Sequence, residues 1–224
     1  ADVLGALEGR LQRAAAGIPD DTPVDRAFAD TLARHRIPVA LPAALLEGMG
    51  WDLEGRRYET SDELLAYCAR VASAVGAMMA LVMGVRDRER LARACDLGTA
   101  MQLTNIARDV GEDAAMGRVY LPLRWLREEG VDPDRWLADP APCAAVRACT
   151  ARLLALADSF YRRARPGIRG LPSRCRPAIH AAATIYAEIG REVARAGHDS
   201  VTRRAVVSRR RKLALAGTAL LRGA

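Results

Sequence analysis

The sequence predicts an all-α protein, and two patterns support this prediction. Apolar residues recur at the spacing of amphipathic helices in segment after segment, whereas the period-two alternation typical of strands is nearly absent. Aromatic residues, which strands favour, make up only 4% of the 224 residues. Half of the residues are apolar, which is enough for a substantial core, and no internal repeat or long linker divides the chain. We therefore expect a single all-helical domain over residues 1–224.

Proline and glycine residues mark the ends of eight predicted helices, and Pro166 is expected to follow the end of the sixth. In TSDELLAYC, Thr60 or Ser61 can cap a helix whose first turn carries Asp62 and Glu63, two acids that the helix dipole stabilises. The two longest helices are rich in small residues, which either let helices pack closely or leave space between them. The predicted helices cover residues 24–35, 42–54, 61–84, 88–114, 122–129, 142–164, 173–197 and 206–221.

Charge and cysteine content narrow the class of protein. Lysine and arginine total 34 against 27 acidic residues, a formal charge of +7, and Lys212 is the single lysine. A GC-rich gene would explain the arginines, and so would anionic ligands, because the guanidinium fork matches phosphate oxygens. Five cysteines without a CxxC pair favour a reducing cytoplasmic compartment. Nucleic acid is not an expected partner, since no binding-fold signature and no aromatic residues interleaved with the basic ones are present.

The two ends of the chain bear on membrane association. The start, ADVLGALEGRLQ, shows no basic residues followed by an apolar stretch, so no signal peptide is expected. No apolar run approaches the roughly 20 residues that span a bilayer. The C-terminal RRAVVSRRRKLALAGTALLRGA is basic and partly amphipathic. We therefore expect a cytoplasmic protein, with peripheral contact to the inner face of the membrane as a further expectation; the oligomeric state is left open.

The segment MQLTNIARDVGEDAAMGRVY, residues 101–120, carries several acids on an otherwise apolar helix. A solvated surface face with arginine partners is one interpretation. However, surface faces favour Glu and Lys, and short acids four residues apart repel each other unless a cation lies between them. Mg²⁺ prefers such oxygen ligands together with substrate phosphates. At 100° per residue, one arc about 100° wide holds Gln102, Asn105, Asp109, Glu112 and Asp113, and the small residues Gly98 and Ala94 continue it.

QLTNIARDVGED followed by GRVYLP resembles the second aspartate-rich region of the squalene and phytoene synthases, the head-to-head prenyl transferases. YCARVASAVG at 67–76, LLEGMGWDLEGRRYET at 45–60, and IYAEIGREV followed by SRRRKLAL are similar to other family segments, in the same order, over about residues 24–215. The resemblance implies the class I isoprenoid (terpenoid) synthase fold with a central cavity. It also implies condensation of two prenyl diphosphates that depends on Mg²⁺, for which Mn²⁺ can substitute.

Bacterial phytoene synthases, which use geranylgeranyl diphosphate and act in carotenoid biosynthesis through a cyclopropyl (prephytoene) diphosphate, are the most similar branch. A squalene or presqualene diphosphate synthase that uses farnesyl diphosphate is the alternative, and an inactive homologue is left open as well. A purely structural helical bundle is the third interpretation of the pattern.

The resemblance also implies roles for individual residues. Asp109 and Asp113 would bind the Mg²⁺ that bridges to a diphosphate, with Gln102, Asn105 and Glu112 in or near its coordination shell. Tyr67 matches a tyrosine at the reacting centre, although Tyr67 and Tyr186 without the family are simply buried tyrosines with hydrogen-bonded hydroxyls. The other implied substrate-binding residues are Arg108 and Arg118 at diphosphate oxygens, Val71, Val75 and Gly76 at the cavity wall, and Tyr186 and Arg191 near the second diphosphate.

Two features depart from the family pattern. Ser73 stands where the family has glycine, and the first aspartate-rich motif of the family is not found. Asp21 and Asp25 in PDDTPVD have the DxxxD spacing, with Asp20 beside them, but Pro23 interrupts any helix there, so we reject this segment as the motif. The resemblance therefore implies that the 224 residues lack the N-terminal helices with half of the metal site, and that this chain alone has little or no activity.

Overall fold

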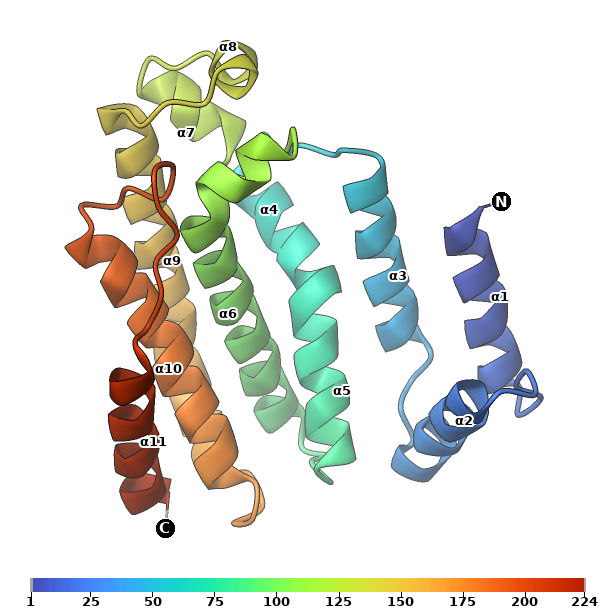
Figure 1. Cartoon of the computed structure of the whole chain (residues 1–224). Helices are drawn as coiled ribbons and strands as arrows, with labels where there is room; N and C mark the ends of the chain where they lie inside the picture. The colour runs from blue at the N-terminus through green and yellow to red at the C-terminus, as the bar shows by residue number, and fades with distance from the viewer. Residues whose placement is uncertain (1, 224) are drawn as a thin grey trace.

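The computed structural model describes residues 2–223, with side chains through Ala219, and all secondary structure in this part of the chain is helical (Figure 1). This confirms the all-α prediction. The helices are α1 (Val3–Ala15), α2 (Pro23–His35), α3 (Ala40–Leu53), α4 (Ser61–Cys68), the π-helical turn η1 (Ala69–Ser73), α5 (Ala74–Val82), α6 (Arg88–Ala115), α7 (Leu123–Glu128), α8 (Pro133–Ala138), α9 (Ala144–Arg169), α10 (Arg176–Arg195) and α11 (Arg209–Gly223).

Two helices, α1 and α8, lie where none was predicted. Asp2 caps α1 by accepting a hydrogen bond from the Gly5 amide at 3.1 Å, and Leu11 of this helix packs against Leu32 of α2. Asp132 caps the short α8 by accepting from two backbone amides. Both caps are ordinary start signals, but each helix is too short or too weakly apolar to stand out in the sequence.

Pro166 does not end its helix, contrary to the prediction, and α9 continues to Arg169. The last turn is held by tertiary contacts, because Gly167 lies directly against the side chain of Arg93 on α6, where a β-carbon would collide. The Arg90 guanidinium also donates to the carbonyl of Gly170 at 3.0 Å. These contacts offset the hydrogen bond that proline cannot make.

The long helix α6 lies at the centre of the bundle and contacts α4, η1, α5, α9 and α10 (Figure 1). Small residues bring η1 and α5 close to it: a β-carbon on Gly76 would lie 2.5 Å from the carbonyl oxygen of Ala94, and one on Gly98 would collide with the Ala72 carbonyl. Ser73 is buried at the same crossing, with its hydroxyl 2.7 Å from that of Thr99. The serine that departs from the family pattern thus has a hydrogen-bond partner on α6.

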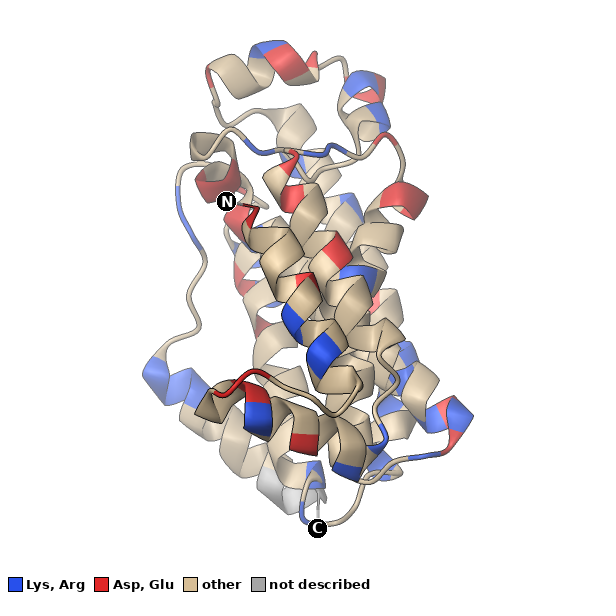
Figure 2. Cartoon of the chain, turned by 90° about the vertical axis from the view of Figure 1, so that its right-hand side faces the viewer, with Lys and Arg blue, Asp and Glu red and all other residues tan. Residues whose placement is uncertain are grey.

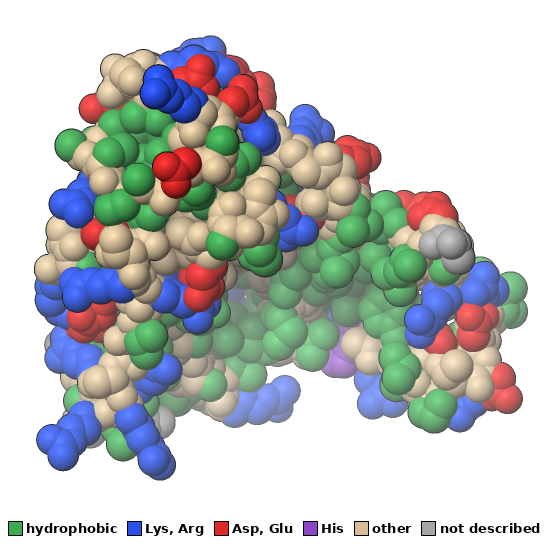
Figure 3. All heavy atoms as spheres, turned by 45° about the horizontal axis from the view of Figure 1, so that its top comes forward, with side chains coloured by type: hydrophobic (Ala, Val, Ile, Leu, Met, Phe, Trp, Pro, Cys, Tyr) green, Lys and Arg blue, Asp and Glu red, His purple; other side chains and the backbone are tan. Residues whose placement is uncertain are grey.

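The continuous helical stretch Ser61–Val82, formed by α4, η1 and α5, is long and apolar enough by length and composition to cross a membrane. This corrects the expectation that no apolar run reaches that length. The stretch packs on α3 and α6, which gives its apolar side chains partners within the bundle. Figure 3 shows a recess with mainly hydrophobic side chains between the α1–α2 side of the molecule and its main body.

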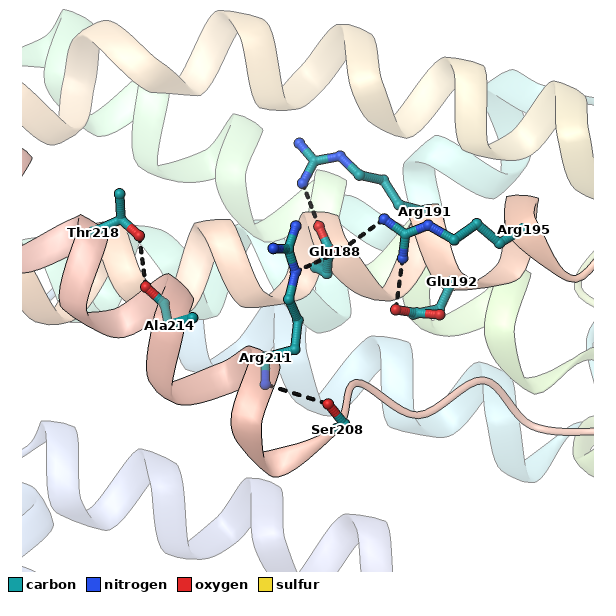
Figure 4. Close-up of polar contacts among 8 residues, drawn as sticks. All are labelled: Glu188, Arg191, Glu192, Arg195, Ser208, Arg211, Ala214 and Thr218. Atoms are coloured by element: carbon teal, nitrogen blue, oxygen red, sulfur yellow. Dashed lines mark hydrogen bonds and ion pairs between the residues drawn. The ribbon is translucent and has the colours of Figure 1, made fainter.

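Glu188 of α10 links α11 to the bundle through a hydrogen bond from Arg211 (Figure 4). Its carboxylate is fully buried and accepts hydrogen bonds from Arg191 at 2.6 Å, Arg195 at 3.0 Å and Arg211 of α11 at 2.9 Å. Burial opposes ionisation, but the three guanidinium groups outweigh it and lower the pKa of Glu188 to about 2. The carboxylate is therefore charged at neutral pH, and its charge is fully paired.

Candidate active site

A cavity of about 340 Å³ lies among η1, α5, α6, α9 and α10. Its walls are mainly apolar, as expected for a site that holds hydrocarbon chains. The predicted wall residues and the small residues of the α6 stripe all belong to it: it is lined by Val71, Ala72, Val75, Gly76, Met79, Met83, Ala94, Leu97, Gly98 and Met101, among others. The sequence left open whether the small residues allow close helix packing or leave space between helices. The structure shows both, because these residues pack closely where η1 and α5 cross α6 and also border the cavity.

The polar residues of α6 begin where the apolar wall of the cavity ends. Gln102 and Asn105 line the cavity, and the Asn105 Oδ1 atom is buried without a hydrogen-bond partner. Asp109 and Asp113 follow at steps of four residues, or about 6 Å along the helix axis per step. The predicted stripe is thus a row of oxygen-bearing side chains that leads from the cavity to two carboxylates.

Asp109 is paired with two arginines. Arg108 donates two hydrogen bonds to it at 2.7 and 2.6 Å, and Arg204 Nε donates a third at 2.7 Å. Arg204 also lies 3.0 Å from Glu112. Burial raises the pKa of Asp109, but the hydrogen bonds from the two arginines outweigh it, so that the net shift is downward.

Arg204 was not predicted as a site residue. It lies 95 residues from Asp109, in the segment between α10 and α11, where the basic run suggested only a surface feature. Periodicity cannot connect residues so far apart, and the pairing follows from how that segment crosses the end of α6. Gly111 marks this crossing, because its amide donates to the Ser200 carbonyl at 2.8 Å.

Asp113 has the opposite environment. Within the described residues its carboxyl group takes part in no hydrogen bond or ion pair. Burial, and after it the negative charge of Asp109, raises the pKa of Asp113 to about 7, although Arg118 acts in the other direction. Arg118, the second predicted diphosphate contact, lines a small pocket together with Asp113. A cation close to Asp113 would therefore be strongly stabilised.

These donors fit a hard divalent cation in part. No group of three histidine, cysteine or acidic side chains is arranged to hold a metal among the described residues. Asp113 and Asn105 fit such an ion, because one carboxyl group lacks a cationic partner and one buried amide oxygen lacks a donor. Asp109 and Glu112 instead face Arg204, so they would have to share their oxygens between arginine and metal. The predicted metal ligands stay a prediction.

Asp52 is a polar residue of the site that the sequence analysis did not single out. It accepts hydrogen bonds from the Tyr67 hydroxyl at 2.8 Å and from the Tyr120 hydroxyl at 2.7 Å. The ring centroids of Tyr67 and Tyr120 lie 5.4 Å apart, and Tyr58 packs against both. Tyr67 is therefore a buried, hydrogen-bonded tyrosine, as its residue type alone suggests, and it also lies one turn before the cavity wall at Val71.

Tyr186 and Arg191 are not among the residues that line the central cavity. Tyr186 packs against the core, and Arg191 is bound to Glu188. Arg191 instead borders a second cavity of about 840 Å³ among α9, α10 and α11. The predicted role of Tyr186 and Arg191 at the second diphosphate stays a prediction.

The acids of PDDTPVD are occupied by arginines. Asp20 pairs with Arg13, Asp21 with Arg26, and Asp25 with Arg10. Thr22 caps α2, and Pro23 occupies its first turn, so the spacing of these acids does not lie on one helix. These contacts support the rejection of the segment as a metal-binding motif.

The sequence of this chain matches a known protein family and named relatives. The model of the squalene/phytoene synthase family matches residues 1–211. A phytoene synthase of Rhodobacter capsulatus is 56% identical over 207 residues, which cover 92% of this chain and 61% of the relative. A phytoene synthase of Cereibacter sphaeroides is 54% identical over 219 residues, which cover 98% of this chain and 62% of the relative. The chain thus spans about three fifths of the length of these relatives.

Solved structures agree with the fold. A dehydrosqualene synthase in complex with ligand is similar with a TM-score of 0.86 and 30% identity, over 98% of this chain and 77% of that one. The squalene synthase HpnC from Alicyclobacillus acidocaldarius is similar with a TM-score of 0.81 and 28% identity, over 87% of this chain and 73% of that one. The predicted resemblance is confirmed, and the chain belongs to the squalene/phytoene synthase family.

Proposed function

We propose that the protein containing this chain condenses two geranylgeranyl diphosphates head to head to phytoene in carotenoid biosynthesis. The observation that carries this proposal is the row of polar side chains on α6. Gln102 and Asn105 line the apolar cavity, and the carboxylates of Asp109 and Asp113 follow them along the same helix. Such a row can hold a hydrocarbon chain at one end and a diphosphate with its cation at the other. The named phytoene synthases among the relatives support the choice of substrate.

The reaction begins when the C–O bond of one allylic diphosphate breaks and the electron pair leaves with the diphosphate. Mg²⁺, when bound, supplies positive charge that stabilises this leaving group. Asp113, Asp109 and Asn105 would hold the ion. Arg108, Arg118 and Arg204 lie on the same part of the molecule, and their guanidinium groups are suited to diphosphate oxygens.

The double bond of the second diphosphate then attacks the allyl cation, and loss of a proton gives a cyclopropylcarbinyl diphosphate. A second ionisation, a rearrangement and loss of another proton complete the hydrocarbon, so phytoene forms without a reductant. Water would capture either cation, and the Val, Met, Ala and Gly side chains of the cavity keep it out.

The test is a product assay on the protein expressed from its complete gene, with Mg²⁺ and either geranylgeranyl or farnesyl diphosphate. We expect a C40 hydrocarbon from the geranylgeranyl substrate, and none from Asp109→Ala plus Asp113→Ala. A dominant C30 product would replace this substrate by farnesyl diphosphate, which is the alternative function. Normal turnover by residues 1–224 alone would overturn the expectation that the family's first aspartate-rich motif is needed.

We further propose peripheral contact with an anionic membrane surface on the cytoplasmic side, through residues 203–213. Arg203, Arg209, Arg210 and Lys212 are exposed there, as are 69% of Val206 and 67% of Leu213. Figure 2 shows the basic start of α11 at its lower left. Each such cation near an anionic leaflet contributes about 1 kcal/mol.

Binding to phosphatidylglycerol vesicles tests this contact. We expect binding at low salt that weakens with added salt and is reduced in Arg209→Gln plus Arg210→Gln. The matched control, Arg162→Gln plus Arg174→Gln, removes two exposed arginines elsewhere and should bind like the wild type. Absence of binding at low salt would contradict the proposal.

A further inference from the structure

Asp52 joins three segments that are distant in the sequence. It lies next to the last residue of α3, whereas Tyr67 lies near the end of α4 and Tyr120 follows α6. Both carboxylate oxygens are used, since Oδ2 accepts from Tyr67 at 2.8 Å and Oδ1 from Tyr120 at 2.7 Å. One carboxylate therefore sets the direction of two phenolic hydrogens.

The packing around the tyrosines keeps these directions. Tyr67 is only 3% exposed, and the rings of Tyr67 and Tyr120 are stacked with an interplanar angle of 28°. Because each hydroxyl group donates its hydrogen to Asp52, the lone pairs of each phenol oxygen point away from the carboxylate. The Tyr67 oxygen is thus prepared to accept a proton while it donates its own.

The cluster lies beside the reacting end of the cavity. Tyr67, Val71 and Val75 follow one another at four-residue steps, and the two valines line the cavity. Tyr120, which donates to Asp52, lines the small pocket that Asp113 and Arg118 also line, so Asp52 lies near the carboxylate row. Tyr67 therefore lies one helical turn before the cavity wall and shares Asp52 with a tyrosine that borders the same small pocket as Asp113.

We propose that Asp52 is a positioning residue for proton removal, which acts through Tyr67 when the last carbocation becomes the hydrocarbon. This inference rests on the proposed function. A C–H bond next to the cationic carbon breaks, and its electron pair forms the new double bond. The proton moves to the Tyr67 oxygen while the hydroxyl proton of Tyr67 moves to Asp52 Oδ2. Asp52 becomes neutral and later releases the proton to water, so no oxidant or reductant is required.

The variant Asp52→Asn keeps the shape of the side chain and removes its charge. In the complete gene product we expect kcat for hydrocarbon formation to fall about 100-fold, a typical contribution of acid–base groups, with KM little changed. Because the cation then lives longer, water captures it, and the ratio of C40 alcohols to phytoene rises. A merely structural role would lower all products together. Glu54→Gln, an exposed acid two residues away, is the matched control.

A double-mutant cycle tests the route through Tyr67. In the Tyr67→Phe background, Asp52→Asn should cause no further loss, because the group through which it acts is gone. Tyr67→Phe alone should shift products toward alcohols in the same way, which keeps the proposal testable if Asp52→Asn does not fold. The proposal would be overturned if Asp52→Asn formed hydrocarbon within twofold of the wild-type rate. It would also be overturned if Asp52→Asn had an undiminished effect in the Tyr67→Phe background.

A readout independent of activity separates this proposal from the proposed function. Burial and then the hydrogen bond and charge of Asp52 raise the pKa of Tyr120 to about 12, so Asp52→Asn should lower it. NMR of protein labelled with ¹³C at the tyrosine ζ carbon measures this ionisation. If the wild type makes neither C40 nor C30 product, the proposed function fails, and this titration decides: a lowered phenol pKa supports the coupling, and an unchanged one overturns it.

Discussion

Two carboxyl groups of this protein, the buried Glu188 and the partly buried Asp113, differ in the cations that contact them. Glu188 accepts hydrogen bonds from three arginines, which lower its pKa to about 2. Asp113 has no such partner among the described residues, and its pKa is raised to about 7. Burial acts in the same direction on both, so the partners decide the outcome. The paired carboxylate fastens one helix to another, whereas the unpaired one is available to the charge of a ligand.

The largest expected difference between the two acids is in catalysis. Asp113→Asn removes a carboxylate that would hold Mg²⁺ and should lower kcat/KM of the complete gene product about a thousandfold. Glu188→Gln should change it by less than about threefold per folded molecule, because its carboxylate is already paired with three arginines of α10 and α11. Steady-state kinetics with geranylgeranyl diphosphate measures both. Equal losses would remove the functional distinction between the two acids.

Stability should show the reverse order. Glu188→Gln leaves three arginines without their common anion and should lower the free energy of unfolding by about 2 kcal/mol, because these arginine side chains are about half exposed and water partly replaces the lost anion. The control Glu192→Gln breaks only a pair at the surface and should cost less than about 1 kcal/mol. Urea denaturation measures both changes.

The pH dependence of the Glu188 contribution sharpens this result. Its folded pKa is depressed, so the contribution is present above the ordinary value near 4.5 and is lost as the pH falls toward about 2. Stability of Glu188→Gln should therefore fall less steeply than that of the wild type in this window. Parallel curves would show that Glu188 is not held charged by its arginines.

Asp113→Asn should instead stabilise the protein without Mg²⁺ by about 2 kcal/mol at pH 8.5, roughly half of what the full pKa shift would give, because Asp113 is only partly buried and water screens its charge. The folded pKa of Asp113 is raised, so the carboxyl group destabilises the fold as the pH rises from the ordinary value of 3.8 through about 7. The gain should accordingly vanish near pH 4. Asp109→Asn, which removes a paired carboxylate, should destabilise at pH 8.5. A gain from both substitutions would show that their environments do not differ.

The smallest expected effect is that of the metal itself on stability. Mg²⁺ at ten times its Kd should stabilise the wild-type fold by about 1.4 kcal/mol. The ion should have little effect on Asp113→Asn and its usual effect on Glu188→Gln. Thermal unfolding with and without Mg²⁺ measures this, with Ca²⁺ as a test of selectivity. Equal stabilisation of all three proteins would place the ion elsewhere.

The sequence by itself determined most of the helices and one face of the site, because both depend on local periodicity. The helical rotation of 100° per residue is sufficient to place Gln102, Asn105, Asp109 and Asp113 on one face. The same rotation continues this row with Gly98. The cavity wall at Val71 and Val75 followed from the resemblance to the family, and the structure brings these residues to the cavity.

Only the tertiary structure decided what each polar group does. Arg204 reaches Asp109 across 95 residues, Asp52 joins Tyr67 to Tyr120, and Pro166 is kept within α9 by contacts with α6. The opposite pKa shifts of Asp109 and Asp113, four residues apart on one helix, arise in the same way. Periodicity places a carboxyl group on a face, but its charge depends on burial and on cations that distant segments bring to it.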